Sequence, residues 1–322
     1  MGEHAPRGRL AEVQRARLLA ATVGAIEEHG YAQTTVAQIT ARSRISRRTF
    51  YEIFEDREAC LMAVVEDVVA MLERELAAID LQRLPWRERV SGGLDAILAF
   101  LDREPALARV CVVQTLHGGP RALEQRDQLL ARLACVIDEG RKQGSQARER
   151  TTVTAEGLVN ATLGIVYARL LRGERRPLVT LRGELMSLIV LPYLGPAAAR
   201  RELLRPLPSA AARRRRHPSA RTLCESDPLE GLPMRLTYRT ACVLQVIAAR
   251  PGISNRAASQ RAGIADQGQM SKLLARLARL GLIANDGARR GNGEANAWTL
   301  TPLGCRVAQR LRVGDGPRGE GV

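Results

Sequence analysis

The chain has 322 residues, which is long enough for two or more domains. Its net charge of +15 and high pI favour a polyanionic partner, although surface arginines need no ligand and composition alone leaves this open. Only 3% of the residues are aromatic, so we expect a mainly aliphatic, helix-favouring core. Residues 1–14 are polar and show no secretory signal, and no run reaches the roughly 18 apolar residues of a membrane span. We therefore expect a cytoplasmic protein without a membrane partner.

The motifs of common enzymes and metal sites are not found in the sequence. Its six cysteines have no close pairs, which argues against a zinc site and a disulfide framework and favours buried thiols: Cys60, Cys111, Cys135, Cys224, Cys242 and Cys305. There is no catalytic elbow motif, no phosphate-binding glycine loop and no metal-ligand spacing, and Gly118-Gly119 is too short to count. We expect no enzyme activity, no catalytic residues, no cofactor and no metal.

The N-terminal third reads as helices. Residues 1–10 are expected to form a disordered basic arm, and a helix over 11–29 to end at Gly30. Thr35 and Gln38 have capping-box spacing at the start of the next helix.

The segment that follows predicts a turn and a short exposed helix. Arg42-Ser43-Arg44 breaks the apolar period, and Ser46 can cap the helix that follows. Phe50 and Phe54 share a face, so we expect both rings inside. The polar residues of the same helix then fall toward solvent: Arg47, Arg48, Thr49 and Tyr51. A short helix with such an edge, braced by a second helix, fits the DNA major groove.

Helical periodicity continues to about residue 195, with breaks at short loops such as His117-Gly118-Gly119-Pro120. The expected helices span 57–79, 85–101, 104–116, 123–139, 154–171 and 179–191, with a charged loop at 141–150. Arg57, at the start of the first of them, could hold a phosphate. No strand alternation appears, so the chain up to this point is predicted to be all-α.

The composition changes after residue 195. Prolines and the run Arg213 to Arg216 indicate a linker over 196–230. Order returns with helices over 238–249, 254–263 and 267–281, the last capped by Asp266. Two strands near 282–283 and 297–300 and a closing helix over 302–311 follow, so residues 231–312 form a second domain and 313–322 a disordered tail.

The block from Arg15 to Leu72 resembles the N-terminal domain of TetR-family transcriptional regulators. The matching residues are Glu28-His29-Gly30-Tyr31, Thr34-Thr35-Val36, Ile39, Ile45-Ser46, Thr49-Phe50-Tyr51, Phe54, Arg57-Glu58-Ala59 and Leu61. The chain departs from that pattern at Arg44, where the family usually has glycine, and at Glu52 and Ile53, where it usually has aromatic residues or His.

This resemblance implies a three-helix DNA-binding domain over 11–56 and a helical effector and dimerisation domain over 57–195. The expected DNA-contacting residues are Thr35, Arg44, Ser46, Arg47, Arg48, Thr49, Tyr51 and Arg57. A small-molecule effector would lie in the bundle. Candidate lining residues, for which core packing is the alternative, are Phe100, Cys111, Gln114, His117 and Tyr167.

The same resemblance implies a homodimer formed through the last two bundle helices. A seam of small residues follows the helix 154–171: Gly157, Ala161, Gly164 and Ala168. Small side chains let a second helix come close, so this seam is expected to be dimer surface. An internal contact with the helix 179–191 is the alternative.

Residues 234–312 resemble the winged helix-turn-helix of MarR-type regulators, a small α+β domain. The resemblance rests on Ser254-Asn255-Arg256, Ala262-Gly263-Ile264, Gln269 to Leu277, Leu280-Gly281-Leu282-Ile283 and Leu300-Thr301-Pro302-Leu303-Gly304. The residues it implies at DNA are Gln267, Gln269, Ser271, Lys272, Arg276, Arg289 and Arg290, the last two at the wing tip. Winged helices also contact proteins, so DNA and protein both stay open as partners of this domain.

The sequence thus predicts a mainly all-α regulator with a small C-terminal winged-helix domain. We expect a repressor that binds operator DNA as a homodimer and is released or altered by a small molecule. A non-specific architectural DNA-binding protein is the alternative.

Overall fold

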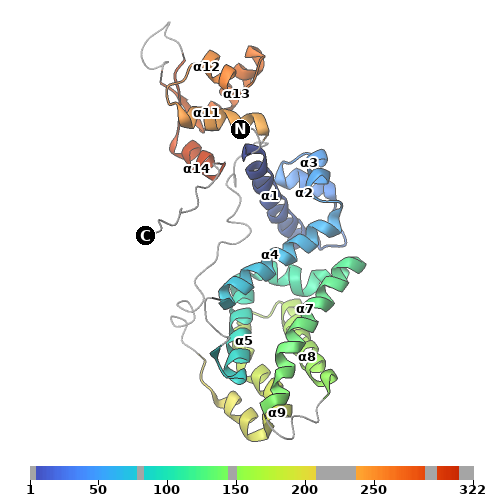
Figure 1. Cartoon of the computed structure of the whole chain (residues 1–322). Coiled ribbons are helices and arrows are strands. Elements are labelled where there is room, and N and C mark those ends of the chain that lie inside the picture. Colours follow the sequence, from blue (N-terminus) through green and yellow to red (C-terminus); the bar gives the residue numbers. More distant parts are fainter. Residues whose placement is uncertain (1–4, 78–82, 144–150, 208–236, 287–295, 312–322) are drawn as a thin grey trace, which may run out of the picture. The chain divides into compact units, whose positions relative to one another are not determined.

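The computed structural model describes residues 5–77, 83–143, 151–207, 237–286 and 296–311 (Figure 1). The chain divides into two compact units, each described by itself. One unit contains residues 1–20, 40–53 and 223–322, and the other contains residues 21–39 and 54–222. Helices predominate in both, and the described residues include one two-stranded sheet.

Three helices open the chain: α1 (Ala5–His29), α2 (Val36–Ser43) and α3 (Arg47–Ile53). Helix α1 begins inside the segment that was expected to be a disordered arm, although this segment contains Pro6 and Gly8; Pro6 lies in the first turn, where a proline removes no hydrogen bond of the helix. Gly30 follows α1 with a φ of 74°, a left-handed conformation that glycine adopts at little cost and that ends the helix.

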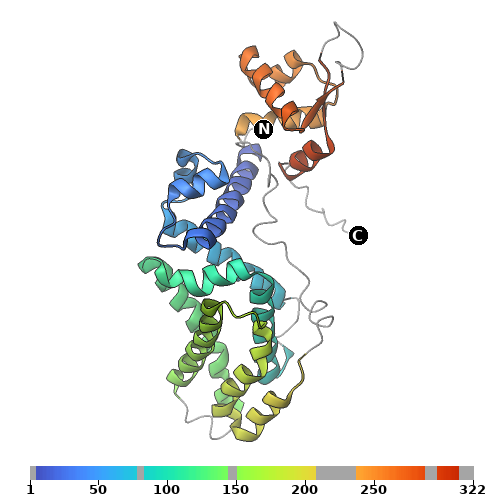
Figure 2. The same cartoon turned by 180° about the vertical axis from the view of Figure 1, so that it is seen from behind.

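The helical bundle follows, and α7 and α8 lie side by side in both views (Figures 1 and 2). Its longer helices are α4 (Arg57–Ala77), α5 (Trp86–Arg103), α7 (Pro120–Asp138), α8 (Thr152–Arg172) and α9 (Arg182–Leu204). Short helical turns join them: α6 (Pro105–Ala108), the π-helix η2 (Arg109–Val113) and the 3₁₀ turns η3 (Gln114–His117), η4 (Glu139–Gln143) and η6 (Leu178–Leu181).

The single helix expected over 104–116 is therefore three short pieces. Pro105 starts α6, and the β-branched Val110, Val112 and Val113 disfavour a regular α-helix in the next turn. All three valines are buried, so packing holds the irregular turn in place.

Helix α9 extends into the region that was expected to be linker. It bends at Gly195, whose φ is 77°, between Pro192 and Pro196, and then continues to Leu204. The fully buried Glu202 pairs with Arg87 of α5 and anchors this extension in the bundle. An ion pair between residues so far apart in sequence cannot be read from composition.

The segment 178–204 also changes the expectation about membrane spans. It is the one helical stretch among the described residues with the length and composition to cross a membrane. Its 18-residue apolar stretch has a mean hydropathy of 1.4, and half of that stretch is buried. The stretch carries the buried ion pairs of Arg182 with Asp95 and of Glu202 with Arg87, and it is bent at Gly195. These features are those of a core helix.

The C-terminal module contains α11 (Tyr238–Ala249), α12 (Asn255–Arg261), α13 (Gln267–Arg279), β1 (Ile283–Asn285), β2 (Trp298–Leu300) and α14 (Pro302–Leu311), seen from the opposite side in Figure 2. β1 and β2 are antiparallel, with Ile283 opposite Leu300, and an isolated bridge joins Ile253 to Trp298. The core of the module includes Val243, Leu244, Ile247, Met270, Leu274, Leu277, Leu282, Trp298 and Val307.

Candidate nucleic-acid interface

The first turn of α2 is closed by the predicted capping box. The backbone N–H of Gln38 donates to Thr35 Oγ1 at 3.2 Å, and the backbone N–H of Thr35 donates to Gln38 Oε1 at 2.7 Å. Each side chain satisfies a backbone donor that the helix leaves free. The predicted pairing is confirmed, and it engages the Thr35 hydroxyl in fixing the helix.

The turn between α2 and α3 passes through Arg44, the one described non-glycine residue with a positive φ, at 55°. Its neighbours stabilise it: the buried Ser43 donates its hydroxyl to the carbonyl of Thr40 at 3.3 Å, and the N–H of Ile45 donates to the same carbonyl at 3.2 Å. A glycine would adopt this backbone conformation without strain, and the side chain of Arg44 is exposed.

Helix α3 is capped and anchored as expected. The N–H of Thr49 donates to Ser46 Oγ at 3.0 Å. Phe50 is fully buried and Phe54, just beyond the helix, is 7% exposed, so the prediction that both rings point inward is confirmed. Tyr51 is 56% exposed and meets Phe50 edge to face, with 5.3 Å between ring centroids.

The outer edge of α3 is polar and open to solvent. Arg47, Arg48 and Tyr51 are exposed and Thr49 is half-buried. Arg48 Nε lies 3.0 Å from Glu52 Oε1, one helical turn away. This pair places one carboxylate on an otherwise cationic edge, so the net charge that α3 offers a phosphate is reduced.

Arg57, which the sequence suggested could hold a phosphate, makes contacts within the protein that the sequence did not indicate. Its guanidinium donates to the backbone carbonyls of Tyr31, at 3.2 Å, and Thr34, and it lies 4.4 Å from the centroid of the Tyr31 ring. Burial raises the pKa of Tyr31, against the lowering effect of Arg57. Nη1 of Arg57 therefore fixes the loop between α1 and α2, and a phosphate contact of this side chain stays a prediction.

The structure brings one group of predicted residues together on the turn and on α3. These residues are Arg44, Ser46, Arg47, Arg48, Thr49 and Tyr51, all within residues 40–53 of one unit. Thr35 and Arg57 belong to the other unit and support local backbone.

The residues predicted for an effector pocket are dispersed. Gln114 lines a hollow with Ile26, Glu27, Gly30, Arg109 and Val110, and its Oε1 accepts a hydrogen bond from the N–H of Tyr31 at 2.9 Å. Phe100 is a core residue and His117 is exposed. Cys111 and Tyr167 are half-buried, and burial raises the pKa of the Cys111 thiol to about 12, so this thiol is neutral at physiological pH.

The small residues of α8 face solvent within this chain. Gly157, Ala161 and Gly164 are exposed, and a methyl group on either glycine would meet no atom within 4 Å. Leu171, at the end of the same helix, is 56% exposed. The internal contact considered as an alternative is therefore absent at these described glycines.

Helix α13 presents a second polar face. Asp266 caps it by accepting from the N–H groups of Gly268, at 2.7 Å, and Gln269, at 3.0 Å, as predicted. Met270, Leu274 and Leu277 are buried. The predicted contact residues on this helix are all exposed: Gln267, Gln269, Ser271, Lys272 and Arg276. Arg289 and Arg290 lie outside the described residues.

Two residues beside this face were missed in the sequence. Arg239 of α11 donates to Gln269 Oε1 at 2.9 Å, and Asn255 Oδ1 accepts from the indole N–H of Trp298 and, at 3.3 Å, from Asn296 Nδ2. These partners are 30 to 43 positions apart in sequence, so no local signal points to them.

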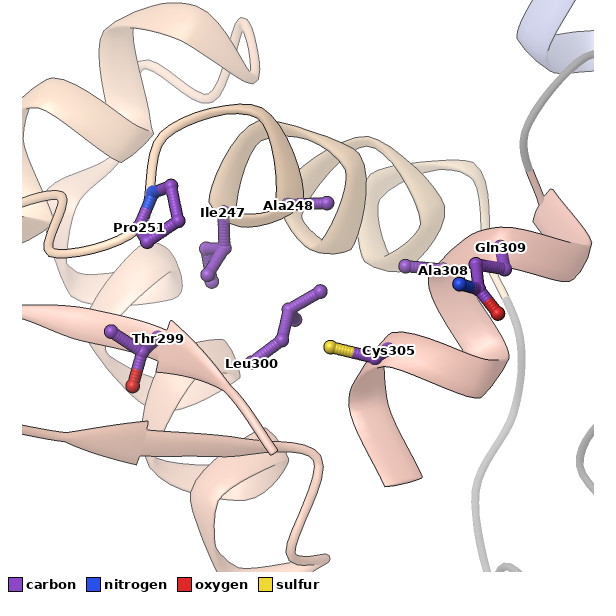
Figure 3. A pocket seen from close by; sticks show the side chains of 8 residues that line it. All are labelled: Ile247, Ala248, Pro251, Thr299, Leu300, Cys305, Ala308 and Gln309. Carbon is purple, nitrogen blue, oxygen red and sulfur yellow. The ribbon is translucent and has the colours of Figure 1, made fainter. Parts of the chain in front are cut away.

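A hollow in the same module lies between α11, β2 and α14 (Figure 3). Ile247 and Leu300 point toward each other across it, and the thiol of Cys305 points toward Leu300 (Figure 3). Its eight lining residues, Ile247, Ala248, Pro251, Thr299, Leu300, Cys305, Ala308 and Gln309, include no charged side chain and none of the exposed residues of α13. Such a lining is unsuited to phosphate.

A capped helix, a tight turn and a second short helix with exposed Arg and Tyr side chains define a helix-turn-helix protein of the kind that regulates transcription. Residues 18–64 match the family model described as bacterial regulatory proteins, tetR family.

Two curated relatives illustrate the match. The HTH-type transcriptional regulator BetI of Burkholderia mallei is 32% identical over 133 residues, which cover 35% of this chain and 68% of that protein. An uncharacterised HTH-type transcriptional regulator of Mycobacterium bovis is 26% identical over 149 residues, which cover 44% of this chain and 68% of that protein. The chain belongs to the tetR family of bacterial regulatory proteins.

Among solved structures, the regulator FadR of Bacillus subtilis in complex with stearoyl-CoA aligns with a TM-score of 0.48 at 20% identity. The alignment covers 56% of this chain and 97% of that chain.

Proposed function

We propose that this protein is a transcriptional repressor that binds operator DNA as a homodimer. The observation that carries the proposal is the exposed edge of α3, on a helix fixed by the Ser46 cap and the buried Phe50. A rigid support matters because base readout needs side chains held in register with the groove.

Each residue of this edge has a chemistry that suits DNA. Arg47 and Arg48 offer planar donors to guanine edges or phosphates. The Thr49 and Tyr51 hydroxyls suit phosphate oxygens, and the exposed ring of Tyr51 can contact a thymine methyl group. Arg44, exposed at the turn, adds a phosphate contact next to Ser46.

The exposed seam of α8 supports the proposed dimerisation. Gly157, Ala161 and Gly164 present a surface on which a second helix can approach closely, and the exposed Leu171 adds apolar area. A two-fold dimer carries two copies of α3, and simultaneous binding of both copies increases the affinity for a palindromic operator.

A small molecule bound in the helical domain would alter operator affinity by favouring one arrangement of the bundle. We assign DNA reading to residues 11–56 and effector binding and dimerisation to residues 57–195. The protein would act in the cytoplasm, where its DNA is.

We further propose that residues 231–312 form a winged helix of the MarR type that contacts DNA. Its support is the order of elements, with an isolated bridge that joins Ile253, in the loop after α11, to Trp298 of the antiparallel β1–β2 pair. Exposed Gln269, Lys272 and Arg276 on α13 would face the groove, and Arg239 would orient Gln269.

The test is an operator titration with Arg47→Ala and Tyr51→Ala. Each change removes one contact, so each should weaken specific binding by about 1–3 kcal/mol, roughly fivefold to more than a hundredfold. Arg176→Ala, an exposed arginine between α8 and η6, is the matched control and should bind like the parent. Unchanged retardation of the operator by both α3 variants would reject the site.

A competition assay separates this proposal from an architectural role. A specific repressor should prefer the promoter beside its own gene over random DNA of the same length at physiological salt. Equal affinity for both would favour the non-specific alternative.

A further inference from the structure

The first turns of α1 lie outside the stretch that matches the tetR family, which begins at residue 18. They carry few apolar side chains, and Gly8 within them disfavours a helix that stands alone. The two larger apolar residues, Leu10 and Val13, are three positions apart and therefore share a face of the helix. Both are nevertheless buried, with exposed fractions of 7% and 8%, so another element must cover this face.

The C-terminal module covers this face of α1. Leu10 and Val13 belong to one hydrophobic cluster with buried residues from all four helices and both strands of the module. The start of α1 and the module also fall in the same compact unit. A helix from the beginning of the chain thus takes part in the core of a domain near its end, which keeps both apolar side chains away from water.

Helix α1 also links this contact to the first DNA-reading element. It continues as one helix to Leu18 and Leu19, which are fully buried and belong to the same unit. Helix α3, with the fully buried Phe50, is part of this unit as well. A continuous helix is a stiff connection, so the turns that hold the C-terminal module cannot move freely against the turns that follow them.

We propose that the first turns of α1 are the docking site of the C-terminal module, and that α3 and α13 therefore bind DNA as one rigid surface. Docking fixes the distance and direction between the exposed side chains of these two helices. A rigid pair selects DNA in which the two contacted segments have one spacing, and its second contact costs less entropy than that of a tethered module. The effect on DNA binding rests on the proposed function, whereas the docking itself does not.

Hydrogen exchange tests the docking without DNA. Leu10→Asp places a charge against the apolar cluster, so exchange should become severalfold faster both in residues 5–14 and in the C-terminal module. Ala11→Asp is the matched control, because it makes the same change in charge at a neighbouring exposed position. Faster exchange confined to α1 would overturn the proposal. If Leu10→Asp does not fold, Leu10→Ala serves in its place and should show the same pattern at smaller amplitude.

The length of the linker tests whether the module is docked or only tethered when the protein binds the promoter beside its own gene. The effective concentration of a tethered module falls roughly as the −3/2 power of linker length, so a doubled linker should lower the affinity about threefold. A docked module is held by α1, and the same insertion of Gly-Ser repeats after Ala220 should leave the affinity of the parent protein unchanged.

The same insertion in the Leu10→Asp variant completes the linker test. This variant has lost the docking contact, so its affinity for the promoter fragment should fall about threefold when the linker is doubled. Equal effects of the insertion in the parent protein and in the variant, including no effect in both, would contradict a single rigid surface.

The exchange and DNA measurements separate the docking from the proposed function. If the parent protein binds no DNA while Leu10→Asp still speeds exchange in the C-terminal module, the proposed function fails and the docking stands. If the parent protein binds the promoter fragment specifically while Leu10→Asp leaves exchange in the module unchanged, the proposed function stands and the docking fails.

Discussion

At the scale of single residues, Glu52 is a negative charge on a surface proposed to meet phosphates. Its carboxylate lies 3.0 Å from Arg48 and competes with DNA for that guanidinium. Glu52→Gln should remove this competition and tighten DNA binding roughly threefold to tenfold at low salt, with less effect at high salt. Glu184→Gln, an exposed residue of α9, is the control for a general change in net charge. Weaker binding after Glu52→Gln would mean that the carboxylate itself takes part in recognition.

Arg44 combines a strained backbone with a candidate phosphate contact, and two substitutions separate these roles. Its φ of 55° costs a residue with a Cβ about 1 kcal/mol relative to glycine. Arg44→Gly should therefore raise the free energy of unfolding by up to about 1 kcal/mol while weakening DNA binding. Arg44→Ala should weaken binding similarly without the gain in stability. Thermal unfolding and operator titration measure the two effects, and equal stabilities of the Gly and Ala variants would contradict the argument from backbone strain.

At the scale of elements, contacts between residues close in sequence could be predicted, whereas contacts between distant residues could not. The caps by Thr35, Ser46 and Asp266 were predicted because each partner lies three residues or fewer away. The hydrogen bonds from Arg57 to backbone carbonyls were not predicted, because these carbonyls lie 23 and 26 residues earlier in the sequence. The same limit explains why the continuation of α9 past Gly195 was not predicted: the buried Glu202 that holds it pairs with Arg87, which is 115 residues away.

The packing of α14 against the hairpin gives a prediction at the same scale. A Cβ on Gly304 would overlap the carbonyl oxygen of Leu282, and backbone cannot move aside as a side chain can. Gly304→Ala should destabilise the C-terminal module by roughly 2–4 kcal/mol. Calorimetry should show a lowered transition for this module while the helical bundle melts as before. Gly93→Ala, on α5, is the control because a Cβ there meets no atom within 4 Å, and an unshifted calorimetric profile for Gly304→Ala would show that α14 adjusts freely.

At the scale of the whole molecule, the net charge of +15 is spread unevenly: residues 231–312 carry 13 Arg or Lys and three Asp or Glu, whereas residues 11–56 carry six of each. Phosphate contacts release counterions, so the logarithm of affinity falls with the logarithm of salt concentration by about 0.9 for each phosphate neutralised. The full chain and a chain lacking residues 231–322 should both bind the operator if α3 reads it. The shorter chain should show a smaller slope, by about 0.9 for each phosphate contacted through the C-terminal module.

This comparison decides what the C-terminal module contacts, because DNA contact changes the salt dependence of operator affinity and protein contact does not. If the module contacts protein, its removal leaves the slope and the footprint unchanged, and the exposed Lys272 and Arg276 of α13 are available to an acidic partner. If it contacts DNA, Lys272→Ala in the full chain should lower the slope by about 1, while leaving the preference for operator over random DNA nearly constant. Gln269→Ala should instead relax that preference with little change in slope, because a neutral amide releases no counterion. A module that reads bases must show both effects, one on each residue, whereas a module that binds only phosphates shows the first alone.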